Sequence, residues 1–438
     1  MMRRAIAAAG LIFLATAARA DGLLPPWSDP TDVPLPASAR SVVAKRADTA
    51  ISPIPGHPEL KRGTTLPDAR LPLYGSRRAA GCEGRWLHVG PAAWLCSDLA
   101  ELSAEAPNDQ PTPIASDGLP YRYYFVGRNG ASGYGSLERA GDEAPDEELD
   151  PGFAVATTEQ RSAKGQTWVR TRHGTWISTS ELGAARPSGF AGQMVGASGL
   201  DFGWALRDKV GVYSAPGSAG KPVRVLGRFE VVPWREEKVV PGGTMVRISE
   251  DGVTPAAWVD GRSVAHPTAS EPPPEVGGVD ERWIDVDLAS QTLVAYEGKR
   301  PVFATLVSSG RGTSVPPGVP PGGPGDVSTH KGTFRIWVKL LTSTMDNLES
   351  PQEDASPAAE GVRYSMEDVP YVQFFDKAVG LHGVFWHGDF GHRRSHGCVN
   401  LAPRDAAWLF GFTSPHLPPG FAAILPSRLD PGTVVRVR

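Results

Sequence analysis

The segment LHGVFWHGDFGHRRSHGCVNL, from Leu381 to Leu401, places one thiol among several imidazoles. The thiol is Cys398, and four of the ten histidines of the chain lie here: His382, His387, His392 and His396. The same stretch contains Gly383, Gly388, Gly391 and Gly397. A cysteine nucleophile needs a base, a group that orients the base, and close approach of the backbone. The pattern therefore predicts a positioned nucleophile at Cys398.

The residue types also indicate how that nucleophile would work. A free thiol has a pKa of about 8.5, so an imidazole must take its proton at neutral pH. Gly397 removes side-chain bulk beside Cys398, which would let backbone N–H groups near 397 and 398 hold an oxyanion.

Zinc binding is the alternative for the same segment. It offers enough ligands: His382, His387, Asp389, His392, His396 and Cys398. However, it has no His-Glu-x-x-His helix, and its glycines favour a turn over a rigid ligand platform. We therefore expect no metal and no other cofactor.

Length and composition set the scale of the protein. A chain of 438 residues suggests roughly three or four domains, and 50 glycines and 42 prolines favour a loop-rich, β-rich protein. The net charge is -4, and residues 1–20 carry three arginines and no acid, so removing them gives -4 - 3 = -7. This acidic balance argues against nucleic acid or an anionic lipid surface as the main partner.

The first twenty residues, MMRRAIAAAGLIFLATAARA, have the pattern of an export signal. Two arginines precede an apolar run, and Ala18-Arg19-Ala20 supplies a small-x-small cleavage site. The alternative, an uncleaved membrane anchor, would need about 20 apolar residues, and this run is shorter. We expect export to the periplasm or cell wall, with no transmembrane segment after cleavage.

The three cysteines fit that compartment. Cys82 and Cys96 are close enough in sequence to face each other across a hairpin, and their disulfide would add about 3 kcal/mol of stability on the loop-entropy model. Two buried free thiols are the alternative. Pairing these two leaves Cys398 without a partner.

A repeated pattern occupies the N-terminal half. Trp86 and Trp94 are spaced like Trp168 and Trp176, and a looser third copy ends at Trp258. Short alternating runs between Gly and Pro suggest small barrels, and these segments resemble bacterial SH3-like domains. The resemblance implies wall binding or substrate presentation. We expect the tryptophans to fill barrel cores rather than stack on ligands, and the acidic run 142–150 to be a solvated loop rather than a calcium site.

Proline-rich segments and strand patterns divide the chain into linkers and domains. A hairpin around residues 284–307, a strand over 332–338 and a helix from Pro403 to Phe410, stopped by Gly411, are predicted in the last domain. We expect a signal peptide at 1–20, linkers at 21–40 and 266–280, and barrel units at 41–105, 113–186 and 200–265. The last domain covers 281–438.

Residues 282 to 438 resemble the catalytic domain of L,D-transpeptidases, the exported cysteine enzymes that remodel bacterial peptidoglycan. The resemblance is carried by Ser395-His396-Gly397-Cys398, by His382-Gly383 upstream, by the Ile284-Asp285-Val286 strand and by Lys331-Gly332-Thr333-Phe334. It implies a mainly β protein, with a β-sandwich-like catalytic domain and short helix preceded by about three small SH3-like barrels.

The resemblance also implies a role for each site residue. Cys398 would be the nucleophile, His382 the general base and Gly383 the carbonyl that orients it. Gly397 would supply the oxyanion backbone and His396 would assist the thiol. Substrate contacts are expected from Tyr371, Ser395 and Asn400.

By resemblance, Cys398 attacks the carbonyl at the L-centre of the third residue of a peptidoglycan stem peptide and releases D-alanine. The acyl group then passes to an amine, which gives a 3-3 crosslink, an exchanged D-amino acid or a wall-attached protein. Transfer to water would make the same site an L,D-carboxypeptidase. A catalytically silent peptidoglycan-binding protein is the further alternative, since SH3-like modules usually bind.

Two departures from the family pattern stand out. Many members have Arg two residues after the cysteine, where this chain has Asn400, which puts a carboxylate contact there in doubt. The Thr-Pro that commonly precedes Gly-Thr-Phe is His330-Lys331 here, behind an insertion from Val315 to Gly325. That insertion could be a lid, although an ordinary exposed loop fits as well.

Overall fold

The computed structural model describes residues 33–108, 117–218, 220–312, 326–348 and 363–438. Within them the chain is mainly β, as predicted, with one α-helix, α1 (Pro403–Phe412). The predicted signal peptide, the linker up to residue 32 and the 315–325 insertion lie outside these ranges. No helix in the described part is long and apolar enough to cross a membrane.

Two sheets and α1 form the C-terminal domain. The first has the order β16-β27-β26-β25-β34-β28 and the second contains β33, β29, β30, β31 and β32. The first comprises β16 (Gln193–Met194), β25 (Arg282–Asp287), β26 (Thr292–Glu297), β27 (Arg300–Leu306), β28 (Gly332–Arg335) and β34 (Val434–Val437). The second comprises β29 (Val338–Asp346), β30 (Ser365–Asp376), β31 (Val379–Gly383), β32 (Val399–Leu401) and β33 (Phe421–Ile424).

One apolar core lies between these sheets. Val286 and Leu293 from the first sheet share a cluster with Phe375 and Leu381 from the second and with Leu409 of α1. The alternation of apolar side chains along β25 and β26 is what a strand with one face in a core requires. This arrangement gives the sandwich with a short helix that the sequence predicts.

Two predicted elements differ in their limits. The expected strand over 332–338 is split, because Ile336 N–H donates to Thr433 O while Trp337 N–H donates to Phe374 O in the other sheet. The helix passes through Gly411 rather than stopping there, because buried Phe412 extends its apolar face. Lys339 Nζ donates to Phe410 O and Thr413 O and so caps the C-terminal end.

The N-terminal segments repeat one local unit three times: a hairpin, a 3-10 turn and a strand. The first copy is β6 (Trp86–Gly90), β7 (Ala93–Cys96), η1 (Ser97–Leu99) and β8 (Ala100–Ser103). The second is β13 (Gln166–Thr171), β14 (Trp176–Ser178), η2 (Thr179–Glu181) and β15 (Leu182–Ala184). The third is β22 (Gly243–Arg247), β23 (Trp258–Asp260), η3 (Gly261–Ser263) and β24 (Val264–Ala265).

Further short strands accompany each copy. With the first copy are β1 (Ser41–Ala44), β2 (Ala50–Ile51), β3 (Gly63–Thr65), β4 (Arg70–Pro72) and β5 (Gly75–Arg77). With the second are β9 (Arg122–Val126), β10 (Ala131–Gly133), β11 (Glu147–Leu149) and β12 (Ala154–Ala163). With the third are β17 (Phe202–Ala205), β18 (Val210–Val212), β19 (Arg224–Leu226), β20 (Val231–Pro233) and β21 (Glu236–Val240). These small sheets are compatible with the expected barrels.

The repeated tryptophans fill cores, as predicted. Trp86, Trp94, Trp168, Trp176 and Trp258 are all buried. The acidic side chains between 142 and 148 are exposed, as expected, but the run is not a loop throughout, because Glu147–Leu149 forms β11 and pairs with β10. The second unit therefore meets solvent through its charges and packs through its aromatic residues.

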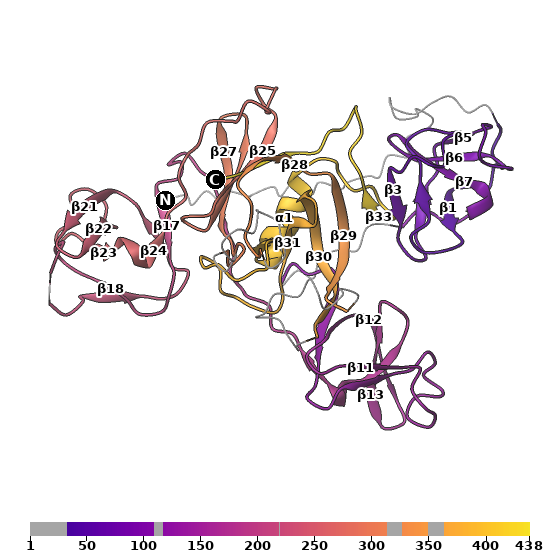
Figure 1. The fold of residues 1–438 in the computed structure, drawn as a ribbon, viewed down its shortest axis with the longest axis horizontal. Coiled ribbons are helices and arrows are strands. Elements are labelled where there is room, and N and C mark those ends of the chain that lie inside the picture. The colour runs from indigo at the N-terminus through magenta and orange to yellow at the C-terminus, as the bar shows by residue number, and fades with distance from the viewer. Residues whose placement is uncertain (1–32, 109–116, 219, 313–325, 349–362) are drawn as a thin grey trace, which may run out of the picture.

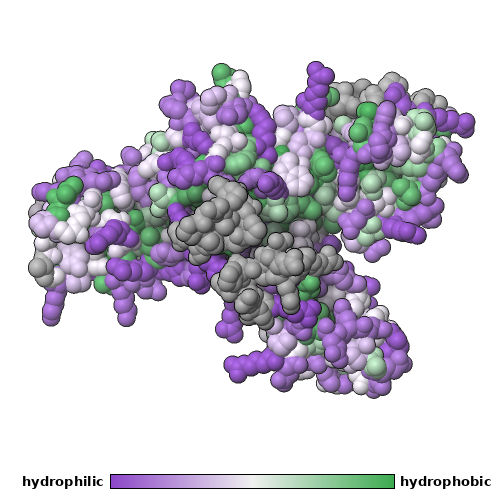
Figure 2. Space-filling view, viewed as in Figure 1, coloured by the Kyte–Doolittle hydropathy of each residue, from purple (hydrophilic) through white to green (hydrophobic). Residues whose placement is uncertain are grey.

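Each N-terminal unit contacts the C-terminal domain, and Figure 1 shows the three as lobes around it. In the first, β3 pairs antiparallel with β33, and the buried Arg62 forms an ion pair with Asp430. In the second, β12 pairs parallel with β30. In the third, Trp204 shares an apolar cluster with Trp283 and Phe390. In the face that Figure 2 shows, the outer lobes carry mostly hydrophilic side chains.

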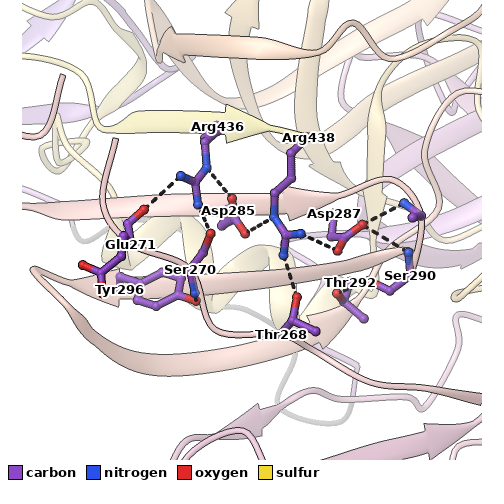
Figure 3. Close-up of polar contacts among 11 residues, drawn as sticks. Thr268, Ser270, Glu271, Asp285, Asp287, Ser290, Thr292, Tyr296, Arg436 and Arg438 are labelled. Atoms are coloured by element: carbon purple, nitrogen blue, oxygen red, sulfur yellow. Dashed lines mark hydrogen bonds and ion pairs between the residues drawn. The ribbon is translucent and has the colours of Figure 1, made fainter. Parts of the chain in front are cut away.

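The proline-rich segment 266–280 is attached to the first sheet through a buried carboxylate (Figure 3). Asp285, 1% exposed, accepts from Arg436 Nε at 2.7 Å and from Arg438 Nε at 2.8 Å. Arg436 also donates to Glu271 O, and Arg438 donates to Thr268 Oγ1. The predicted linker is therefore held against the domain by charge-assisted hydrogen bonds.

Asp285→Asn should destabilise this domain, because Arg436 loses this carboxylate partner and Arg438 keeps only Asp287. Breaking a buried ion pair costs about 3–5 kcal/mol, and we expect the lower end because both arginines are partly exposed. Thermal unfolding of the full chain measures the effect. The matched control is Asp251→Asn, whose carboxylate also pairs with an arginine but is exposed. Equal unfolding temperatures for the two variants would contradict this account.

Candidate active site

The parallel pairing of β31 with β32 brings the predicted nucleophile and base into one place. The register sets Leu381 opposite Val399 and His382 opposite Asn400. Cys398 immediately precedes β32, so it lies at the strand end beside β31. Leu381 and Val399 are fully buried in the domain core, which fixes this register.

The thiol of Cys398 is partly exposed, and its hydrogen bond goes to a backbone carbonyl. Sγ donates to Ala378 O at 3.7 Å, in the turn between β30 and β31. Burial of the group raises the pKa of the Cys398 thiol. The resting nucleophile is therefore a protonated thiol at neutral pH.

His382 is arranged to accept a proton. The ring is 2% exposed, and its Nδ1 lies 3.1 Å from the carbonyl oxygen of Gly383. Because the carbonyl can only accept, Nδ1 carries the proton and Nε2 is left as the basic nitrogen. Burial lowers the pKa of His382 to about 4, so the ring is neutral at rest. The structure shows no hydrogen bond between this ring and the thiol among the described residues, as is common in unliganded enzymes.

The loop around Gly397 is held by hydroxyl groups. Gly397 has φ +132°, a conformation that favours glycine. Its N–H donates to Ser395 Oγ at 3.1 Å, and Ser395 Oγ donates to Cys398 O. Thr329 Oγ1 donates to Gly397 O at 2.6 Å and accepts from Gly310 N–H. Ser395, expected to contact substrate, is buried and its hydroxyl serves the loop instead.

Two residues that the sequence analysis did not identify lie next to His396. The guanidinium of Arg311 donates to His396 Nε2, so that ring carries its proton on Nδ1. Tyr364 stacks on the same ring, with centroids 6.3 Å apart. Burial, and then the Arg311 charge, lower the pKa of His396. The position of Arg311 in a glycine-rich loop was the one signal available in the sequence.

Asn400, expected to contact substrate, is buried and hydrogen-bonds to His387. Its side-chain amide lies 2.9 Å from His387 Nε2, while His387 Nδ1 accepts from Asp389 N–H. Burial lowers the pKa of His387 to about 4, so the ring is neutral and has one N–H, which must be on Nε2. The amide oxygen of Asn400 must accept this N–H, so the amide oxygen and nitrogen exchange places by a 180° rotation of the side-chain amide. This rotation also gives a partner to the buried Oδ1.

The structure corrects the expected place of Tyr371. Its side chain is 4% exposed in the domain core, and its hydroxyl donates to Gly118 O at 2.9 Å. It therefore joins β30 to the second N-terminal unit and does not line an open surface. The zinc alternative also finds no support in the geometry: among the described residues, no three ligands of the 381–401 segment converge.

Residues 281–437 match the family model of the YkuD domain, the L,D-transpeptidase catalytic domain. The match covers the C-terminal domain. The matched segment contains the whole two-sheet arrangement from β25 to β34, including His382 and Cys398. A comparison with curated proteins found no match.

Solved L,D-transpeptidases are among the structural neighbours of this chain. The Enterococcus faecium L,D-transpeptidase C442S mutant is 23% identical, with a TM-score of 0.25, over 36% of this chain and 50% of that one. The Mycobacterium smegmatis L,D-transpeptidase is 18% identical, with a TM-score of 0.25, over 65% of this chain and 99% of that one. The chain thus spans half the length of the first neighbour. Scores this low add nothing to the family match.

The remaining predicted pair lies away from the YkuD domain. Cys82 and Cys96 form a disulfide with Cα atoms 5.6 Å apart, which joins the end of β7 to the loop before β6. Cys398 is the free cysteine.

Alkylation of Cys398 should follow the raised pKa of its thiol. Because burial disfavours the thiolate, the rate with iodoacetamide should rise about tenfold per pH unit from pH 6 to 8, without a plateau. Mass spectrometry under non-reducing conditions measures the single label, and Cys398→Ser should take none. A plateau below pH 7 would contradict this and reveal a thiolate–imidazolium pair.

Gly397→Ala should slow acylation of Cys398 while leaving the chain folded. A side chain at φ +132° costs about 1–3 kcal/mol and shifts the backbone N–H groups beside the thiol. The control is Gly411→Ala, on the open side of α1, where an added Cβ meets nothing within 4 Å. Acylation by a carbapenem and thermal unfolding measure both variants. Equal acylation rates would show that the Gly397 conformation does not matter for the site.

Proposed function

We propose that this protein is an exported, cysteine-dependent peptidoglycan L,D-transpeptidase. The observation that supports the proposal is the parallel β31–β32 pairing, which sets His382, held through Nδ1 by Gly383 O, opposite Asn400, two residues after Cys398. It lies within a domain that matches the L,D-transpeptidase family model. The proposed substrates are peptidoglycan stem peptides.

The first half-reaction forms a thioester. His382 Nε2 takes the thiol proton as Cys398 Sγ attacks the carbonyl carbon at the L-centre of the third stem residue. Because the Gly397 N–H already donates to Ser395 Oγ, the Cys398 N–H is the proposed donor to the oxyanion. The intermediate collapses, the C–N bond to the terminal D-alanine breaks, and His382 returns the proton to the leaving amine.

The second half-reaction transfers the acyl group. An acceptor amine attacks the thioester, gives its proton to His382 and releases the Cys398 thiol. A second stem peptide gives a crosslink, a free D-amino acid gives an exchanged stem, and a protein amine gives attachment to the wall.

Many family members have an arginine at the position of Asn400, and we propose that Arg311 takes over its role in this chain. Asn400 holds His387, whereas the Arg311 guanidinium lies at His396, beside the catalytic loop. A stem peptide carries carboxylates, which a guanidinium binds well. Loss of this charge would raise KM more than it lowers kcat.

Export to the periplasm or cell wall is part of the proposal. The Cys82–Cys96 disulfide supports an oxidising compartment. We also propose that the three small β units are SH3-like modules that bind the wall or present the substrate. Their proposed boundaries are 41–105, 113–186 and 200–265.

Incubation with a disaccharide tetrapeptide tests the function. Mass analysis should show loss of D-alanine together with a dimer, and Cys398→Ala should abolish both, because no other group can form the thioester. Monomeric tripeptide without dimer would instead assign the site to an L,D-carboxypeptidase. If the tetrapeptide stays unchanged while a thiol reagent still labels Cys398, the proposed substrate class is wrong.

A further inference from the structure

Three potential metal ligands converge where the second N-terminal unit meets β30. They are His173, which follows β13, and the adjacent Glu367 and Asp368 of β30. Their ligand atoms all lie within 4.8 Å of one another. His173 Nε2 is 3.7 Å from Asp368 Oδ2 and 4.0 Å from Glu367 Oε2.

Two carboxylate oxygens in this group are buried without a hydrogen-bond partner among the described residues. They are Glu367 Oε2 and Asp368 Oδ2. The Asp368 side chain is only 7% exposed, and its other oxygen already accepts from Arg172 Nε at 3.2 Å and Thr342 Oγ1 at 2.6 Å. Oδ2 is thus the oxygen that faces His173. Burying an acceptor without a partner costs free energy, so a cation at this site would stabilise the two oxygens.

The local charge leads to the same conclusion. Arg172 is the cation that contacts this pair, and it offsets only one of the two carboxylates. Burial, and then the charge of Asp368, raise the pKa of Glu367 to about 8. Two adjacent carboxylates with one guanidinium beside them leave a negatively charged site that a cation would balance.

We propose that His173, Glu367 and Asp368 bind one divalent metal ion of the zinc type at this junction. One imidazole nitrogen and two carboxylate oxygens are a donor set that suits zinc and leaves a fourth position for water. Ligand bonds of about 2.0–2.1 Å set tetrahedral ligands about 3.3 Å apart. The His173 ring is 59% exposed and free to move, and its distances of 3.7 Å and 4.0 Å to the two oxygens exceed that spacing by about 0.4 Å and 0.7 Å.

The ion would fasten the second unit to the strand that leads into the active site. Ala154 of β12 bridges Met366 of β30, and the Tyr123 hydroxyl donates to Asp368 O. Three residues before Glu367, Tyr364 stacks on His396. Metal at the junction therefore stabilises the attachment of this part of β30 and is separate from the chemistry at Cys398.

Zinc titration of the full chain tests the site without any measurement of activity. The Cys398→Ala background removes the catalytic thiol as a ligand, and a chromophoric chelator reports the free metal. We expect one ion per chain.

Single variants then assign the ligands. His173→Ala and Glu367→Gln should each weaken zinc binding by at least about tenfold. The matched control is His57→Ala, an exposed histidine that also lies next to a glutamate, and it should bind as the parent does. Binding that His173→Ala leaves unchanged would overturn the proposal. So would no binding at all, which would mean that Glu367 keeps its proton beside Asp368.

Discussion

The active site depends on the parallel pairing of β31 with β32. A one-residue slip of β31 would turn Leu381 out of the core and move His382 off the face that it shares with Asn400. The buried Leu381, Val399 and Leu401 oppose that slip. The proposed base and nucleophile are thus positioned by apolar packing behind them, and the polar groups of the loop then adjust the fine geometry.

The surrounding units reinforce this arrangement from several sides. Tyr123 of the second unit stacks on Phe385, in the segment that follows His382. Arg228 of the third unit donates to Gly388 O and pairs with Asp389, next to His387. The histidine-rich segment is therefore packed between two N-terminal units. A module that binds the wall could restrain the catalytic loop through these contacts.

Several features were predictable because their signals are local. The hairpin of β25 and β26, the start of α1 at Pro403 and the buried tryptophans follow from periodicity and helix-start chemistry. The end of α1 was not predictable from the sequence. Gly411 was expected to stop the helix, but the tertiary contacts of Phe412 and Lys339 extend it. The same holds for Tyr371, whose partner Gly118 comes from a distant unit.

The sequence by itself determined the mainly β class, the choice of Cys398 and His382, and the repeat of the N-terminal units, since residue type and short spacing carry that information. Only the tertiary structure decided that Arg311 and Tyr364 reach His396, that Ser395 and Asn400 serve other residues, and that His173 meets Glu367. The reason is physical. Hydrogen bonds and ion pairs between segments far apart in the chain depend on how strands from different units pair, and no local pattern records that pairing.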